Sequence, residues 1–135
     1  MVKQIFLNLP VQDLEQSKSF FTALGFSINE QFSDSTAACI VVSDTIYVML
    51  LTHEKFKQFT PKDISDATRT TELLASLSVE TRDEVNTIAD AAIAAGGTEV
   101  RLPQDHGFMY GRAFNDLDGH IWEVFWMNMD ALPSS

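Results

Sequence analysis

A single carboxylate interrupts an apolar stretch near the end of the sequence. The segment FNDLDGHIWEVFW, residues 114–126, begins with a turn at 116–119 and continues as an apolar strand with Glu123 in its middle. A carboxylate in such surroundings must be solvated, paired or protonated, because burying a lone charge is costly. Glu123 can therefore hold a cation, accept hydrogen bonds from Arg112 or Tyr110, or act as a general base if desolvation raises its pKa.

Two further polar residues that could take part in a site, His106 and Arg112, lie shortly before Glu123 in the sequence. His106 lies in PQDHGFMYGR, a glycine-flanked loop at the predicted end of a sheet, and is a second catalytic candidate; an exposed loop histidine is the alternative. Arg112 alternates with Phe108 and Tyr110 and can pair with Glu123, with an anionic ligand or in a surface salt bridge. The candidates for lining a binding cleft are Asn8, Phe6, Phe108, Tyr110, Arg112 and Phe125.

The first half of the chain predicts a strand, a helix and three more strands. QIFLNLPV alternates, so that Phe6 and Asn8 share one face and the aliphatic residues share the other; bonding to strand backbone is the alternative role for Asn8. Asp13 is placed to cap a helix that Gly25 ends. The strands that follow are predicted at 26–32, 36–42 and 45–51.

The second half repeats this order of elements. A strand is predicted at 73–80, a helix at 83–95 that Gly96 and Gly97 end, and strands at 98–103, 108–114 and 120–127. In the last strand, Ile121, Glu123 and Phe125 share one face, while Trp122, Val124 and Trp126 share the face that packs against a helix.

This duplication predicts an α+β fold built from two tandem βαβββ modules in a single domain. The modules cover residues 1–52 and 72–129, and 53–71 form a polar linker with a short helical start around 54–59. If the two sheets face inward, they enclose a concave cleft, where a small molecule is expected to bind.

Composition limits the classes of partner. The 135 residues are 45% hydrophobic and carry a net charge of −10, without any cluster of lysine and arginine, which argues against nucleic acid and anionic membranes. No apolar run reaches membrane-spanning length, the start lacks a signal-peptide cleavage site, and the lone Cys39 excludes a disulfide within the chain. We therefore expect a cytoplasmic protein.

Two stretches resemble signatures of the vicinal oxygen chelate superfamily, which includes glyoxalase I, fosfomycin and bleomycin resistance proteins and extradiol dioxygenases. LPVQDLEQSKSFFTALGF, residues 9–26, is similar to the signature of the first module, and FNDLDGHIWEVFW is similar to the last-strand pattern D-x-D-G-x-x-x-E. The chain looks most similar to bacterial proteins labelled as predicted lactoylglutathione lyases. The resemblance implies the paired βαβββ fold and a homodimer.

The resemblance also implies a divalent metal, such as Zn, Ni, Mn or Fe, with Glu123 as its last-strand ligand. The other ligand positions of the superfamily fall on or near Phe6, Leu74 and Val48 or Met49, and none of these side chains is an ionic ligand. The ligand set is therefore incomplete, although an unaligned loop such as that of His106 can supply a ligand.

Two classes of function remain open. The first is a lyase, isomerase or dioxygenase that acts on a small oxygenated substrate, with Glu123 as metal ligand or base and His106 assisting. The second is a metal-free protein of the antibiotic-sequestration type, which binds an apolar or planar ligand without catalysis. Its cleft would be lined by the aromatic residues Phe6, Phe108, Tyr110 and Phe125.

Overall fold

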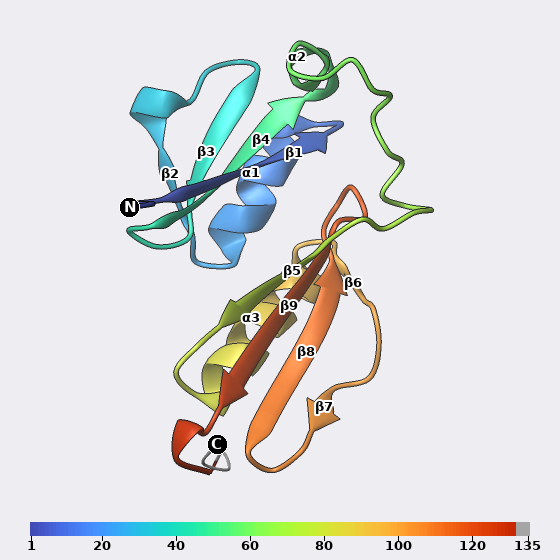
Figure 1. The fold of residues 1–135 in the computed structure, drawn as a ribbon. Coiled ribbons are helices and arrows are strands. Elements are labelled where there is room, and N and C mark those ends of the chain that lie inside the picture. Colours follow the sequence, from blue (N-terminus) through green and yellow to red (C-terminus); the bar gives the residue numbers. More distant parts are fainter. Residues whose placement is uncertain (132–135) are drawn as a thin grey trace. The chain divides into compact units, whose positions relative to one another are not determined.

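The computed structural model describes residues 1–131 and divides into two compact units (Figure 1). Unit 1 comprises residues 1–66, and unit 2 begins at residue 67. Each unit is a sheet with a helix packed on one face, so the chain has the α+β class and the two βαβββ modules that the sequence predicts. No helix within residues 1–131 is long and apolar enough to cross a lipid bilayer.

Unit 1 is a four-stranded sheet with one main helix. Its sheet has the order β1-β4-β3-β2, with β1 parallel to β4 and the other neighbours antiparallel. The elements are β1 (Ile5–Val11), α1 (Leu14–Ala23), β2 (Ser27–Asn29), the 3-10 turn η1 (Glu30–Phe32), β3 (Ala37–Val41), β4 (Ile46–Thr52) and α2 (His53–Lys57).

Local sequence signals explain the ends of α1. The Asp13 side chain accepts a hydrogen bond from the backbone N–H of Gln16 at 3.1 Å, which confirms the predicted cap. Gly25 has a φ of 102° and ends the helix, as predicted. Leu9 and Val11 are buried on one face of β1, and Phe6 and Asn8 on the other face are exposed, which confirms the predicted alternation.

One predicted strand of unit 1 is shorter than expected. The strand predicted at 26–32 stops after Asn29, because the Asn29 side chain accepts a hydrogen bond from the backbone N–H of Gln31 at 3.0 Å and begins the turn η1. An asparagine that bonds to nearby backbone in this way competes with the strand ladder.

Unit 2 repeats the plan with one additional short strand. Its sheet has the order β5-β9-β8-β6, β5 is parallel to β9, and β7 pairs with β8 beyond the end of β6. The elements are β5 (Leu74–Ser78), α3 (Arg82–Ala94), β6 (Thr98–Glu99), β7 (Gln104–Asp105), β8 (Met109–Asn115), β9 (Ile121–Met127) and the 3-10 turn η2 (Met129–Ala131).

Only residues 98 and 99 of the strand predicted at 98–103 form a strand, β6, and a loop leads from it to β7. Val100 still donates its backbone N–H to the Ala113 oxygen at 3.1 Å, but the chain then leaves β8 until β7. Pro103 has no N–H with which to continue the ladder. The interruption places Arg101 in a loop rather than in a strand.

Helix α3 covers one face of this sheet and determines which side chains of β9 are buried (Figure 1). Val85, Ala89 and Ala92 of α3 are buried, as are Phe114 on β8 and Trp122 and Val124 on β9. The side chains of a strand alternate between its faces, so Glu123 and Phe125 lie on the opposite face. We call the face that α3 does not cover the open face of unit 2.

The stretch DLDG is a structural turn that starts β9 in this register. The buried Asp116 carboxylate accepts hydrogen bonds from the backbone N–H groups of Asp118 and His120, at 2.9 and 3.0 Å, and from Nε1 of Trp122 at 3.0 Å. Burial raises the pKa of Asp116. Gly119 has a φ of 92°, and an added Cβ would lie 2.8 Å from the Ala67 carbonyl oxygen.

Replacing Gly119 with alanine should destabilise unit 2 by about 1–3 kcal/mol, because a clash with Ala67 adds to the cost of a positive φ. Gly107→Ala is the matched control, since Gly107 has a φ of 78° but nothing within 4 Å of an added Cβ. Urea unfolding followed by tryptophan fluorescence measures both, because both tryptophans lie in unit 2. Equal losses in the two variants would contradict the clash with Ala67.

Candidate functional site

Glu123 is the centre of a small polar cluster on the open face. In the sheet it lies opposite Ser76 of β5 and Ala113 of β8. The Ser76 hydroxyl donates a hydrogen bond to Oε1 of Glu123, and Nη2 of Arg101 donates to Oε2 in an ion pair. The side chains of Arg101 and Glu123 are 37% and 21% exposed, so the pair is accessible from solvent.

These partners determine the charge state of Glu123. The hydrogen bond from Ser76, followed by that from Arg101, holds the pKa of Glu123 below its ordinary value of 4.5, and both outweigh the effect of burial. The hypothesis that desolvation raises the pKa of Glu123 and makes it a base near neutral pH is therefore wrong. At neutral pH Glu123 is an ionised hydrogen-bond acceptor.

The lowered pKa links this cluster to stability. A carboxyl group whose pKa is lower in the folded chain stabilises the fold at pH values above its ordinary pKa, which is 4.5 for Glu123. This contribution is lost as the pH falls through the lower pKa of the folded state. The cluster is therefore intact in the neutral range and weakens only under acidic conditions.

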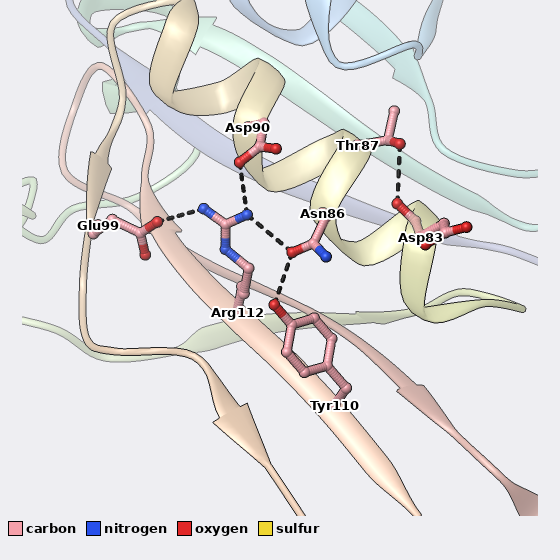
Figure 2. A network of polar contacts seen from close by, with 7 residues as sticks. All are labelled: Asp83, Asn86, Thr87, Asp90, Glu99, Tyr110 and Arg112. Carbon is pink, nitrogen blue, oxygen red and sulfur yellow. Dashed lines mark hydrogen bonds and ion pairs between the residues drawn. The ribbon is translucent and has the colours of Figure 1, made fainter. Parts of the chain in front are cut away.

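Arg112 and Tyr110 do not pair with Glu123, which corrects the sequence prediction. Figure 2 shows both side chains directed at α3, where each donates a hydrogen bond to Oδ1 of Asn86, at 3.1 and 2.8 Å respectively. The register explains this placement, because Arg112 lies opposite Val124, whose side chain is buried beneath α3. Directly opposed residues of an antiparallel pair share one face of the sheet.

Arg112 instead holds α3 to the sheet. Its Nη1 donates to Asp90 at 2.7 Å and its Nη2 donates to Glu99 at 2.5 Å, so one guanidinium lies between two carboxylates (Figure 2). The Arg112 side chain is only 10% exposed, and charge-assisted bonds of this kind are among the stronger ones in proteins. These contacts join β8 to α3 and β6, so the network stabilises the packing of the helix on the sheet.

His106 lies in the exposed turn between β7 and β8. Its backbone N–H donates to the Met109 oxygen at 2.8 Å, and its ring is tilted against that of Phe108 with 6.5 Å between centroids. Met109 lies four residues along β8 from Ala113, the partner of Glu123, which corresponds to roughly 13 Å at about 3.3 Å per residue. No described contact brings His106 to Glu123.

The base of that turn is fastened to the start of α3. Asp105 accepts from Nη2 and Nη1 of Arg82 at 2.5 and 3.3 Å, and the Arg82 guanidinium lies 4.5 Å from the centroid of the Tyr110 ring. The bond from Arg82, with that from the Gly107 backbone, lowers the pKa of Asp105 to about 2. The turn that carries His106 is thus tied to the α3 side of the sheet.

Phe125 is the predicted site residue that shares the open face with Glu123. It lies opposite Gly111, where an added Cβ would be 3.3 Å from the Cβ of Phe125. The residues that flank Glu123 and Phe125 across the two neighbouring strands are all small: Ser76, Ser78, Gly111 and Ala113. Part of the Phe125 ring and the Glu123–Arg101 pair are therefore accessible side by side.

Phe6 and Asn8 belong to unit 1. The Phe6 ring stacks on Tyr47 of β4, with 4.7 Å between centroids and 10° between planes, and is 47% exposed. Nδ2 of Asn8 donates to the Phe6 backbone oxygen at 3.4 Å, which matches the alternative role of bonding to strand backbone. Both side chains lie on the face of the unit 1 sheet that does not pack on α1.

The donor set does not fit a resident divalent metal. Within residues 1–131 no three His, Cys, Asp or Glu side chains come together in a group that could hold one. At Glu123 the nearest polar groups are a hydroxyl and a guanidinium, and the guanidinium already supplies the positive charge that the carboxylate needs. A metal ion at this carboxylate would have to displace Arg101.

Arg101 is the site residue that sequence reasoning missed. Arg101 lies inside the strand predicted at 98–103, and its partner Glu123 is 22 residues further along the chain. The one local signal is Pro103, which interrupts a strand two residues later. Ser76 is a small polar residue, and its contact with Glu123 follows only from the pairing of β5 with β9.

Comparisons with known proteins indicate the fold family. Residues 3–43 match the family model described as bleomycin resistance protein-like N-terminal. The chain is 34% identical to a hypothetical protein, SA1046, from Staphylococcus aureus, with a TM-score of 0.78 and coverage of 93% of this chain and 95% of that chain. No curated protein matches the sequence.

More distant solved structures share the same fold. A glyoxalase-related enzyme from Fulvimarina pelagi is 20% identical, with a TM-score of 0.77 and coverage of 92% of this chain and 88% of that one. The fosfomycin resistance protein FosX from Mesorhizobium loti is 14% identical, with a TM-score of 0.69 and coverage of 96% and 97% respectively.

Replacing Ser76 with alanine should raise the pKa of Glu123 toward its ordinary value of 4.5, because the Ser76 hydrogen bond is the largest cause of the lowering. A carboxyl-carbon NMR titration measures this pKa directly. Ser78→Ala is the matched control, since Ser78 lies on the same face of β5 opposite Phe125. An unchanged Glu123 titration in the Ser76 variant would contradict the hydrogen bond.

Proposed function

Because the chain belongs to the glyoxalase/bleomycin resistance protein/dioxygenase superfamily, the vicinal oxygen chelate proteins, we propose that it binds a small organic molecule. The proposed site is the open face of unit 2 around Glu123, Arg101 and Phe125, and it works without a resident divalent metal. This corresponds to the metal-free binding class, one of the two that the sequence left open.

The observation that carries this proposal is that both carboxylate oxygens of Glu123 accept hydrogen bonds from side chains of the same unit. Glu123 stands where the superfamily resemblance places a metal ligand, yet Ser76 and Arg101 occupy its two oxygens. Arginine stays charged throughout the physiological range, so it is a permanent counter-ion for the carboxylate. A carboxylate paired in this way orients polar groups and has little remaining affinity for a metal.

The rest of the open face supports binding of an apolar body. Half-buried apolar side chains lie on it around the polar cluster, and they are Met109, Ile121, Phe125 and Met127. Ligand sites are typically apolar surfaces with a few placed polar groups. The open face has this composition, with Arg101, Glu123 and Ser76 as its polar groups.

The homodimer and the cytoplasmic location implied at the outset remain proposals. β1 and β5 lie at the edges of their sheets and carry exposed apolar side chains, such as Ile5 and Leu74. Natural proteins usually cover or protect edges of this kind, and a second copy of the chain is one way to do so.

The metal-dependent enzyme is the competing proposal, and the geometry gives it little support. A lyase, isomerase or dioxygenase of the predicted kind needs Glu123 free for a metal or raised in pKa, with His106 close by. Glu123 instead has two partners and a lowered pKa, and His106 lies at the other end of β8.

Elemental analysis of untagged protein exposed to Ni, Zn, Mn and Fe(II) and then desalted tests the metal-free site. We expect far less than one metal per chain in the wild type and in Glu123→Ala alike, because no described set of ligands converges on Glu123. Near-stoichiometric metal in the wild type that is lost in Glu123→Ala would contradict the proposal and favour the enzyme.

A screen of small neutral aromatic fragments, followed by backbone amide NMR shifts in excess EDTA, tests the binding itself. We expect shifts concentrated at open-face residues of β8 and β9, reduced in Phe125→Ser. Trp126→Phe, on the face toward α3, is the control and should retain the shifts. The binding proposal fails if no fragment affects the open face.

A further inference from the structure

The Arg101 guanidinium makes fewer ionic hydrogen bonds than the guanidinium groups of Arg82 and Arg112, the other two arginines of unit 2 that form ion pairs. Arg112 binds two carboxylates, and Arg82 binds both oxygens of one carboxylate. Arg101 makes a single bond, from Nη2 to Glu123, and within residues 1–131 its Nε and Nη1 have no acceptor. Guanidinium groups present their N–H donors as a planar fork that matches a pair of oxygens.

The geometry points to a small organic carboxylate as the ligand, bound through the N–H donors of the Arg101 guanidinium that Glu123 does not use, with its apolar body on Phe125. This inference rests on the proposed function and specifies its ligand class. Arg101 would be the residue that contacts the ligand's charge. Glu123 and Ser76 would be positioning residues, which hold the guanidinium over the open face.

The same unit shows that one guanidinium can serve two carboxylates. Arg112 lies between Asp90 and Glu99, giving that group of three a net charge of −1. Arg101, Glu123 and a ligand carboxylate would have the same net charge. The hydrogen bond from Ser76 stabilises Glu123 as the ionised partner of Arg101, so this ion pair keeps the guanidinium in place for a second carboxylate.

The open face beside Arg101 presents the partly exposed ring of Phe125 to the body of such a ligand. Phe125 is two residues from Glu123 on the same face, and Gly111 opposite it has no side chain to cover the ring. The other neighbours on the adjacent strands also have small side chains: Ser78 lies opposite Phe125, and Ala113 lies opposite Glu123. A flat or branched apolar body attached to a carboxylate can therefore reach the ring and the guanidinium together.

NMR titrations with benzoate and phenylacetate, each beside its neutral amide, test this ligand class. In the wild type we expect at least one acid to bind about tenfold more tightly than its amide, because the charge-assisted fork recognises only the acid. Arg101→Gln should remove this preference. Arg69→Gln is the matched control, since Arg69 is exposed in the same unit without a described side-chain bond.

The Glu123→Gln variant separates a charge effect from a structural one. Glutamine keeps an oxygen that accepts from Arg101 but removes the neighbouring negative charge. We therefore expect the acids to bind a few-fold more tightly to Glu123→Gln, with the amides unchanged. If the pair were merely structural, the variant would weaken acids and amides equally, and the inference would be overturned.

The outcomes also separate this inference from the proposed function. If acids and amides shift the open-face amides equally, and Arg101→Gln changes neither, the carboxylate inference is wrong while small-molecule binding stands. If neither series shifts the open face of the wild type, the carboxylate inference is overturned, and failure of the neutral-fragment screen as well would overturn the binding proposal.

Discussion

The alternation of β9 beneath α3 is the constraint on which the site depends. Trp122 and Val124 are buried against the helix, so Glu123, which lies between them in the strand, must face the open face of the sheet. A shift of one residue in register would bury the carboxylate under α3 and expose the tryptophan. The buried Asp116, which bonds to the Trp122 indole, and the tight turn at Gly119 oppose such a shift.

Once Glu123 is on the open face, its partners determine its chemistry. A carboxylate alone on an apolar sheet would be driven toward protonation or toward a cation. Ser76 and Arg101 provide two hydrogen bonds and one positive charge from within the chain, and the pKa of Glu123 falls. Under the proposed function, this acidic position of the fold is neutralised by an arginine of the same chain rather than by a metal ion.

Features that depend on neighbouring residues could be predicted from the sequence, and features that depend on distant ones could not. The cap at Asp13, the end of α1 at Gly25 and the faces of β1 and β9 follow from local patterns, and the structure confirms them. Tyr110 and Arg112 share one face of the sheet, as their alternation along β8 predicts. The prediction that they face Glu123 is wrong, because alternation within β8 does not reveal the register between β8 and β9. That register places Arg112 opposite Val124 and Tyr110 opposite Trp126.

Arg101 could not be predicted for a related reason. Its position depends on the chain leaving β8 before Pro103, and its partner lies on a strand that is distant in sequence. No periodicity connects a loop arginine to a carboxylate on another element. The expected catalytic role of His106 remains a prediction, as do the expected ligand contacts of the aromatic residues. Of these aromatic residues, Phe125 shares the face of Glu123.

A crystal structure grown with excess zinc, with anomalous diffraction recorded at the zinc edge, tests the central claim most directly. We predict that Arg101 and Ser76 remain within hydrogen-bond distance of the Glu123 carboxylate, without an anomalous peak beside it. A zinc peak at Glu123, with the Arg101 guanidinium turned away, would contradict the assignment of arginine as the counter-ion of this site.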